Sequence, residues 1–457
     1  MLFNSYEFLF IFLPLTFIIY FYLSENHYRK TSRLFLVISS LFFYSWWSII
    51  YLPLIVGSII VNFYIGNLLL KRTNKTILSI GVGLNLSLLG YFKYLDFFIE
   101  NINYLSNSNF ELLNLALPLA ISFFTFQQIA YLVDSYRGET YEYTLLDYSV
   151  FVTFFPQLIA GPIVHHKEMM PQFRDNSNLK INYQNISLGL FILSLGLFKK
   201  VVIADTFALW ATSGFDEMQI LTFWQGWATS LSYTFQLYFD FSGYTDMAIG
   251  VALLFNIKLP INFNSPYKSL DIQEFWRRWH ITLSRFLRDY IYIPLGGNRK
   301  GSIATYGNIM ITFILGGIWH GAGWTFVFWG FMHGVALVVN RIWRNLGFKL
   351  WSWIAWFVTF NFINISWVFF RAKEWDDATK VLGAMFSTNF IYTINHLEAI
   401  MLLLGFIITL LFKNSISYIN SKFEFNFRQM GLFVALSFIS ILIIRLGAKS
   451  EFLYFNF

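Results

Sequence analysis

Cysteine is absent from this sequence, and charged residues make up only 12% of it. The first absence excludes disulfide bonds and thiolate catalysis. The second excludes a surface solvated like that of a soluble domain, in which about 25% of the residues are charged. The net charge is +7, but no run of basic residues is long enough to form a nucleic-acid-binding arm.

Apolar residues dominate instead, since 56% of the 457 residues are hydrophobic and 21% are aromatic. They form long unbroken runs, whereas the strands of a membrane β-barrel alternate over about ten residues. Runs of about 17–25 apolar residues predict membrane-spanning helices. Such runs lie near 7–23, 33–48, 49–70, 76–98, 113–134, 147–163, 185–207, 223–241, 243–257, 305–320, 323–343, 350–371, 396–412 and 430–446. We expect a single all-α membrane domain over residues 1–457, with about eleven true spans and additional re-entrant or interfacial helices.

The positions of Lys and Arg in short loops predict the orientation of the chain. The basic loops at 29–33, 71–75 and 413–428 are expected on the cytoplasmic side. The first span has no basic residue before it and no cleavage site after it, so it is expected to remain in the protein. Both termini then lie outside, including a C-terminal tail at 447–457.

The segment 270–300 differs from the apolar runs around it. Aromatic and leucine side chains recur in it at helical spacing, and the pairs Glu274–Arg278 and Arg285–Asp289 have opposite charges four residues apart. This pattern predicts one amphipathic helix on or partly inside the membrane, ending at the proline and glycines of 294–297.

Three histidines are predicted to lie at membrane depth: His280, His320 and His333. Because an ionisable group there is costly to bury, each is a candidate functional residue. The alternative for each, strongest for His333, is a structural histidine bonded to a main-chain oxygen. The adjacent pair His165 and His166 is expected in a polar loop, and because no third ligand is evident we expect no metal site.

Several long motifs carry a resemblance to a known family. They are LPLAISFFTFQQIAYLVDSYRGE (117–139), FFPQLIAGPI (154–163), YFDFSGYTDMAIG (238–250), FWRRWHITLSRFLRDYIYIPLGGNRKG (275–301) and GGIWHGAGWTFVFWGFMHG (316–334). In this order they resemble the membrane-bound O-acyltransferase family, and within it the bacterial branch that O-acetylates alginate or peptidoglycan, which is related to the teichoic-acid D-alanylation protein. The resemblance implies a ring of helices around a thin centre with a funnel from each face, in the bacterial inner membrane.

The same resemblance implies that His320 is catalytic and that His280 is a second active-site residue. Acyl transfer to a hydroxyl needs a base, and a histidine suits that role near neutral pH. We therefore expect His320 to act as the base and His280 as a positioning or polarising partner, although these roles can be exchanged. The developing oxyanion needs a hydrogen-bond donor, for which a second histidine or Trp319 is a candidate.

Charged residues near these histidines have two interpretations each. Arg277 and Arg278 are candidates to attract a phosphate-bearing donor, either acetyl-CoA or an acyl carrier, or else they anchor the segment at the cytoplasmic interface. Asp240 and Asp246 lie in apolar surroundings, where they either order the core or line a tunnel. No permanently bound cofactor is expected.

The tail contains the pattern F-x-Y-x-x-F at Phe452, Tyr454 and Phe457, which resembles a C-terminal motif of this branch in which the tyrosine is proposed to hold the acyl group. The alternative is an interfacial aromatic anchor. Eight extended residues reach roughly 25 Å. Half of a hydrocarbon core is about 15 Å, so the tail can reach the bilayer midplane.

The resulting hypothesis is an acetyltransferase that moves acetyl groups from a cytosolic donor across the inner membrane through an acyl-Tyr454 ester, for O-acetylation of peptidoglycan. The resemblance implies a periplasmic partner similar to Ser-His-Asp esterases of the SGNH type, which passes the acetyl to the polymer. Alginate or another exopolysaccharide is the alternative acceptor. A transporter or flippase, and an enzyme that acylates lipids, are the alternatives of other classes.

Overall fold

The structure, a computed structural model, describes residues 1–457 except 27, 160, 422, 425, 448–451 and 454–457. The described residues form helices joined by loops and contain no β-strand. This confirms the predicted all-α class. Several helices begin at a side chain that accepts their first free N–H groups, such as Asn74 before α4 and Thr222 before α12.

The helices of the first half of the chain are η1 Glu7–Phe12, α1 Leu13–Glu25, α2 Arg29–Ser45, η2 Ile49–Tyr51, α3 Leu52–Lys71, α4 Lys75–Leu89, η3 Gly90–Tyr94, α5 Leu95–Ser106, α6 Ile121–Tyr136, α7 Leu145–Thr153, α8 Phe155–Leu158, α9 His166–Arg174, η4 Asn176–Leu179 and α10 Tyr183–Phe198. Those of the second half are η5 Lys199–Ala204, α11 Asp205–Thr212, η6 Ser213–Glu217, α12 Phe223–Leu254, η7 Pro266–Lys268, α13 Ile272–Arg278, α14 Ile281–Leu287, η8 Arg288–Tyr292, α15 Gly301–His320, α16 Trp324–Asn345, α17 Ser352–Arg371, α18 Trp375–Met385, α19 His396–Leu411, α20 Ser415–Ile419 and α21 Phe427–Arg445.

Within the described part of the chain, 9 helical stretches are long and apolar enough to cross a membrane. They are Glu7–Glu25, Ile49–Lys71, Lys75–Ser106, Tyr183–Glu217, Gly301–His320, Trp324–Asn345, Ser352–Arg371, His396–Ile419 and Phe427–Arg445. By this measure the expected eleven spans are not reached. The chain is a multi-pass membrane protein.

Two predicted spans, 223–241 and 243–257, are in fact one helix, α12, of 32 residues. The prediction of a break near Gly243 was wrong because the glycines of this helix serve helix packing. A Cβ at Gly250 would lie 2.6 Å from the main-chain oxygen of Gly189 on α10. Glycine therefore lets α10 and α12 approach backbone to backbone, and most of α12 is buried.

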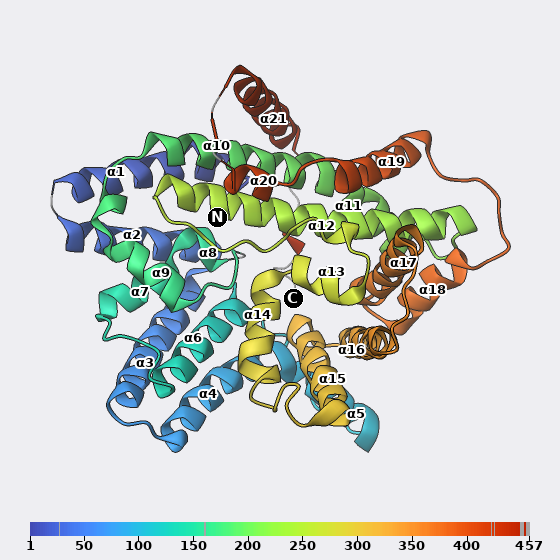
Figure 1. Cartoon of the computed structure of the whole chain (residues 1–457), viewed down its shortest axis with the longest axis horizontal. Coiled ribbons are helices and arrows are strands. Elements are labelled where there is room, and N and C mark those ends of the chain that lie inside the picture. The colour runs from blue at the N-terminus through green and yellow to red at the C-terminus, as the bar shows by residue number, and fades with distance from the viewer. Residues whose placement is uncertain (27, 160, 422, 425, 448–451, 454–457) are drawn as a thin grey trace.

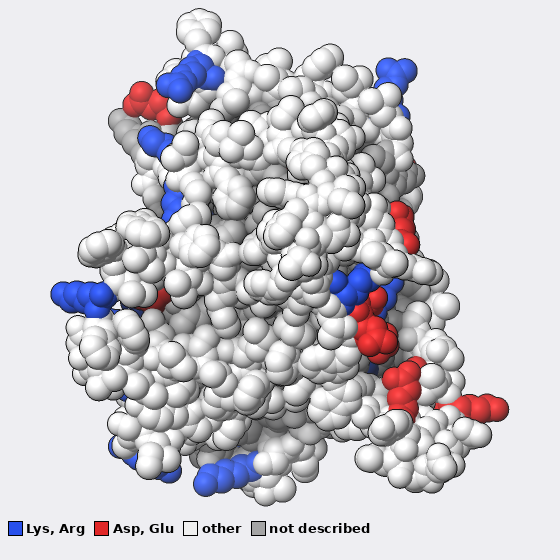
Figure 2. Space-filling model, turned by 90° about the vertical axis from the view of Figure 1, so that its right-hand side faces the viewer, with Lys and Arg blue, Asp and Glu red and all other residues white. Residues whose placement is uncertain are grey.

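Figure 1 shows where the other helices lie relative to this pair. The helices α10 and α12 run side by side across the upper half of the view, with α3, α4 and α6 below them on the left and α15 and α16 below them on the right. The short helices α13 and α14 lie near the centre of the view, and α21 lies at its edge. The face in Figure 2 is largely uncharged, with its Lys, Arg, Asp and Glu side chains toward the margins, as expected of a lipid-facing surface.

The segment 270–300 is not the single amphipathic helix that its pattern predicted. It breaks between α13 and α14 at His280, whose φ of 42° lies in the left-handed region. The break is fixed by Asn262, whose main-chain oxygen accepts the N–H of Ile281 and whose side chain accepts that of Thr282. The aromatic stripe is buried in the core rather than laid on a membrane surface, because this segment lies inside the ring of helices.

The predicted ion pairs of this segment are half right. Glu274 and Arg278 pair at 2.7 Å, as predicted. Arg285 instead pairs with Glu168 of α9, and Asp289 pairs with its neighbour Arg288. A partner from a distant part of the chain therefore replaces the local one.

The stretch 155–164 has the irregular backbone predicted from its proline and glycine. Helix α8 ends at Leu158, and the non-helical backbone after it is buried. The N–H of Ile163 donates to the hydroxyl of Thr282 at 3.0 Å. Protein groups thus bond this backbone where lipid offers no partner.

Candidate functional site

His320 is the last residue of α15 and is 3% exposed. Its position depends on the close packing of α15 against α16. A Cβ at Gly317 would lie 2.3 Å from the main-chain oxygen of Phe326, and one at Gly330 would lie 2.4 Å from that of Phe313. Glycine at these two positions therefore lets the helices touch and fixes the end of α15.

The structure brings together the two histidines that the motifs singled out. The ring centroids of His280 and His320 are 6.5 Å apart, and the indole of Trp319 lies 4.9 Å from His320 and 6.2 Å from His280. All three side chains are buried. Three groups that hydrogen-bond or move protons thus share one apolar site.

A hydrogen bond fixes the tautomer of His280. Its Nδ1 lies 3.3 Å from Oδ1 of Asn262, which also accepts the N–H and the hydroxyl proton of Thr282. Because that oxygen only accepts, Nδ1 carries the proton in the neutral ring and Nε2 is the acceptor nitrogen. Asn262 was not predicted from sequence, since nothing in its local pattern places it beside His280.

Lys93 of η3 bonds the main-chain carbonyls at the end of α15. Its Nζ lies 2.5 Å from the main-chain oxygen of Trp319, 3.2 Å from that of His320 and 3.3 Å from the hydroxyl of Ser122. The last carbonyls of a helix lack partners within the helix, so a lysine there satisfies them. Sequence reasoning missed Lys93, although a lone lysine inside the run 76–98 was a usable signal.

His333 has both ring nitrogens bonded within the protein. The indole N–H of Trp276 donates to its Nδ1 at 3.1 Å, and its Nε2 lies 3.1 Å from the hydroxyl of Ser366. These bonds favour the structural interpretation of His333. Its ring contacts that of Trp329, and the ring centroid of Trp329 lies 5.2 Å from that of His320. His333 therefore acts on the site through Trp329.

Two cavities adjoin the histidine pair. The first, of about 610 Å³, is lined by Lys93, Gln236, Gly321, Phe370 and Leu453, among others, and so reaches the residue after His320. The second, of about 550 Å³, is lined by Ile281, the residue after His280, and by four arginines: Arg277, Arg285, Arg288 and Arg341. The site therefore lies between a mixed cavity and a basic one.

The two neighbouring arginines of the prediction have different positions. Arg277 lines the basic cavity, and no ion pair to it occurs among the described residues. Arg278 is bonded to Glu274 and to the main-chain oxygen of Asn264, and it is not part of the cavity wall. Of these two neighbours, only Arg277 can contact a ligand in the basic cavity.

Both buried aspartates of α12 pair with lysines of η5. Asp246 lies 2.6 Å from Lys199, and Asp240 lies 2.6 Å from Lys200. The second oxygen of Asp240 accepts the main-chain N–H of Leu453 at 3.0 Å. The ion pairs favour the first predicted alternative, in which both aspartates order the core, and Asp240 additionally contacts the tail.

Phe452 of the tail lies in the core. Phe452 is 1% exposed, with its ring stacked 4.3 Å from that of Tyr244 and 5.8 Å from that of Phe241. Phe241 in turn lies 4.8 Å from the ring of His280. The predicted acceptor Tyr454 and the predicted docking residue Phe457 fall outside the described residues.

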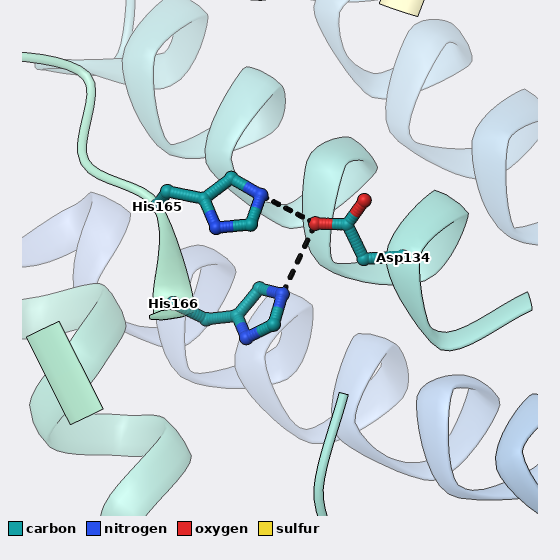
Figure 3. A group of neighbouring side chains, drawn as sticks. All are labelled: Asp134, His165 and His166. Atoms are coloured by element: carbon teal, nitrogen blue, oxygen red, sulfur yellow. Dashed lines mark hydrogen bonds and ion pairs between the residues drawn. The ribbon is translucent and has the colours of Figure 1, made fainter. Parts of the chain in front are cut away.

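The expectation for His165 and His166 was wrong in two respects. His166 is buried rather than solvated, and a third candidate ligand is present: Asp134 of α6. Figure 3 shows both rings directed at this carboxylate, whose Oδ2 lies 2.6 Å from Nε2 of His165 and 3.0 Å from Nε2 of His166. Sequence spacing cannot show this contact, since it depends on how α6 packs against the start of α9.

Comparison with known proteins identifies the family. A family profile described as "MBOAT, membrane-bound O-acyltransferase family" matches residues 7–374. The chain belongs to the membrane-bound O-acyltransferase family. The resemblance seen in the motifs is thereby confirmed, and the chain is an enzyme that transfers acyl groups to oxygen rather than a transporter.

Three relatives illustrate the range of this membrane-bound O-acyltransferase branch. The peptidoglycan O-acetyltransferase of Helicobacter pylori is 49% identical, covering 100% of this chain and 98% of that protein. A probable alginate O-acetylase, AlgI, of Pseudomonas putida is 42% identical over 85% of this chain and 80% of its own. The teichoic acid D-alanyltransferase of Streptococcus thermophilus is 29% identical over 55% and 68%, respectively.

Proposed function

We propose that this protein transfers acetyl groups from a cytosolic donor across the membrane for O-acetylation of peptidoglycan. The observation that carries the proposal is the buried group of His280, Trp319 and His320 between a basic cavity and a cavity that the C-terminal tail reaches. Peptidoglycan is favoured by the Helicobacter pylori relative, which matches over the full chain, and an exopolysaccharide such as alginate is the second candidate because the next relatives match over 85%.

The basic cavity suits a donor that carries phosphate. Arginine forms charge-assisted bonds to phosphate, and four arginines line this cavity. The positive-inside rule assigns it to the cytoplasmic face of a bacterial inner membrane, together with the basic loops at 71–75 and 299–300. The donor is then acetyl-CoA or a carrier bearing phosphopantetheine, and both chain termini lie in the periplasm.

The acyl acceptor in this proposal is Tyr454. The ring of Phe452 lies 5.8 Å from that of Phe241, which in turn lies 4.8 Å from the ring of His280, and Leu453, bonded to Asp240, lines the first cavity. Tyr454 directly follows Leu453 in the sequence. This supports a tail that enters the site and not one that lies at the membrane interface.

The proposed first half-reaction conserves charge and atoms. His320 removes the phenol proton of Tyr454, and the phenol oxygen bonds to the acetyl carbonyl carbon of the donor. The carbon–sulfur bond of the thioester then breaks, and the thiol leaves with the proton from His320. In the second half-reaction a serine of a periplasmic SGNH-type esterase takes the acetyl from the tyrosine ester, the phenol regains a proton, and the serine ester transfers the acetyl to a sugar hydroxyl.

The tautomer of His280 refines the division of roles. Its Nε2 is the acceptor nitrogen in the neutral ring, so His280 suits a proton relay better than an oxyanion donor. The indole N–H of Trp319 is buried and has no acceptor among the described residues. A buried donor without a partner is costly, which is consistent with a group kept for the oxyanion.

The test uses a deletion strain complemented with variants at equal membrane levels. We expect Tyr454→Phe and His320→Ala each to abolish polymer O-acetylation, and mass spectrometry of the C-terminal peptide to find an acetyl adduct in the wild type but in neither of these variants. Tyr104→Phe, at an exposed tyrosine of α5, is the matched control and should retain full acetylation. Full acetylation by Tyr454→Phe would refute the tyrosine ester, and full acetylation by His320→Ala would refute the whole assignment. Separate assays of peptidoglycan and of secreted polysaccharide decide the acceptor.

A further inference from the structure

Four side chains with metal-binding atoms lie close together at a place separate from His280 and His320. They are Asp134 at the end of α6, His165 and His166 at the start of α9, and Tyr290 in η8. The ligand atoms of the aspartate and the two histidines all lie within 4.8 Å of one another. The hydroxyl of Tyr290 lies 2.9 Å from Oδ2 of Asp134 and 2.9 Å from Nε2 of His165.

These contacts crowd a single carboxylate oxygen. Oδ2 of Asp134 has three neighbours within hydrogen-bonding distance: Nε2 of His165, Nε2 of His166 and the hydroxyl of Tyr290. The guanidinium of Arg137 lies 3.9 Å from its other oxygen. Ligands about 2.0–2.2 Å from a tetrahedral ion are roughly 3.3 Å apart, so a small outward shift of these atoms would leave room for a cation.

The surroundings also match those of a metal site. The Nδ1 atom of His166 lies 3.1 Å from the hydroxyl of Tyr143, a partner that orients the ring when Nε2 binds a metal. His166 and Asp134 are buried, whereas the side chain of His165 is 21% exposed, so an ion can enter past it.

We propose that Asp134, His165, His166 and Tyr290 form a binding site for a divalent transition-metal ion, best matched by Zn²⁺. Two imidazoles, one carboxylate and one phenol supply four nitrogen and oxygen ligands. Four such ligands suit the tetrahedral coordination of zinc, whereas calcium and magnesium prefer six or more oxygen ligands. The set is closed by protein groups, so the ion has a structural and not a catalytic role.

The ion would join three elements that meet at the basic cavity. Helix α9, which begins with the histidines, also carries Glu168, and Glu168 pairs with Arg285 in the cavity wall. Tyr290 belongs to η8, which also contains the cavity residues Arg288 and Tyr292. Fixing α9 and η8 to α6 would therefore hold the arginines of the cavity in place. This role is independent of the identity of the acyl donor.

The experiment measures zinc in the full-length protein, purified in detergent on a tag without histidine. We expect about one zinc per chain in the wild type. Added Zn²⁺ should raise the Tm of chelator-treated wild-type protein, and His166→Ala should abolish both results. His165→Gln, at the partly exposed ligand, should still fold and should bind zinc at least about tenfold more weakly.

The matched control is His396→Ala, which removes an exposed histidine at the start of α19. It should retain zinc and the Tm response of the wild type. If the wild type holds no zinc and its Tm does not respond to Zn²⁺, the cluster is only a hydrogen-bonded network and the proposal is wrong. Equal zinc binding by His165→Gln and the wild type would overturn the ligand assignment. Neither outcome bears on the Tyr454 assay, so the two proposals fail separately.

Discussion

The side-chain nitrogen of Lys93 lies 2.5 Å from the main-chain oxygen of Trp319, where α15 ends. The same nitrogen is 3.2 Å from the main-chain oxygen of His320. The adjacent Tyr94 donates its hydroxyl proton to the main-chain oxygen of Ile318 at 2.7 Å. Two consecutive residues of one helix thus bond three consecutive carbonyls of another, and they set where the imidazole of His320 lies.

Replacing Lys93 with methionine should reduce acetyl transfer more than it reduces stability. The substitution keeps the apolar stem but removes the bonds to the α15 carbonyls, and removing the partly buried ammonium group offsets part of the stability that these bonds supply. A misplacement of about 1 Å at a catalytic group can cost about 10²-fold in rate. We expect a loss of at least about tenfold in acetylation per folded molecule, with a monodisperse protein of slightly lower Tm.

Lys349→Met is the control, since Lys349 is an exposed lysine outside the site. Lys93→Arg should restore part of the activity because arginine can still donate to the carbonyls. If Lys93→Met lowers Tm strongly while the activity of the folded fraction is unchanged, Lys93 has a purely structural role.

Asp240 and Asp246 allow tail binding to be separated from core stability. Both carboxylates pair with a lysine of η5, but only Asp240 accepts the N–H of Leu453. Lys200 keeps Asp205 as a second partner in Asp240→Asn, whereas Asp246→Asn removes the carboxylate that pairs with Lys199. Breaking a buried pair costs about 3–5 kcal/mol, so Asp246→Asn should be the less stable variant.

Asp246→Asn, the less stable variant, should nevertheless carry more acetyl on its C-terminal peptide than Asp240→Asn. Normalised to folded protein, Asp240→Asn should carry clearly less acetyl than Asp246→Asn, because only the former weakens the bond that holds the tail. The measurement combines quantitative mass spectrometry with thermal unfolding. Equal acetyl content in the two variants would show that Asp240 does not position the tail.

The sequence was sufficient for the fold class and for the central histidines. Long apolar runs leave helices as the only structure that bonds its own backbone in lipid, and the motifs around His280 and His320 identified the pair that the structure brings together. Local pattern failed where distant residues decide the structure. Asn262 breaks the predicted helix at His280, and Lys93 and Asp134 reach their partners only through helix packing.

Trp319→Phe should lower the rate without unfolding the protein. Phenylalanine keeps an aromatic ring beside both histidines but lacks the indole N–H that we assign to the oxyanion. Loss of one such donor typically costs 10²–10³-fold in kcat. Trp367→Phe is the matched control, because Trp367 is also a buried tryptophan but its ring packs on Trp329 rather than on the two histidines. Similar kcat values for the two variants would contradict the assignment.

Arg277→Ala and Arg278→Ala test the basic cavity with two adjacent residues. Arg277 lines the cavity, whereas Arg278 is bonded to Glu274 outside it. If Arg277 binds a donor phosphate, its loss removes a charge-assisted bond of about 1.5–3 kcal/mol, which solvent in an open cavity reduces toward the lower value. Arg277→Ala should therefore raise KM for the donor about tenfold with kcat nearly unchanged, and the effect should shrink at high salt. Arg278→Ala should leave KM within about twofold of the wild type. Because both variants remove one positive charge from the same helix, equal KM increases would indicate a general field effect, and the direct donor contact of Arg277 would be refuted.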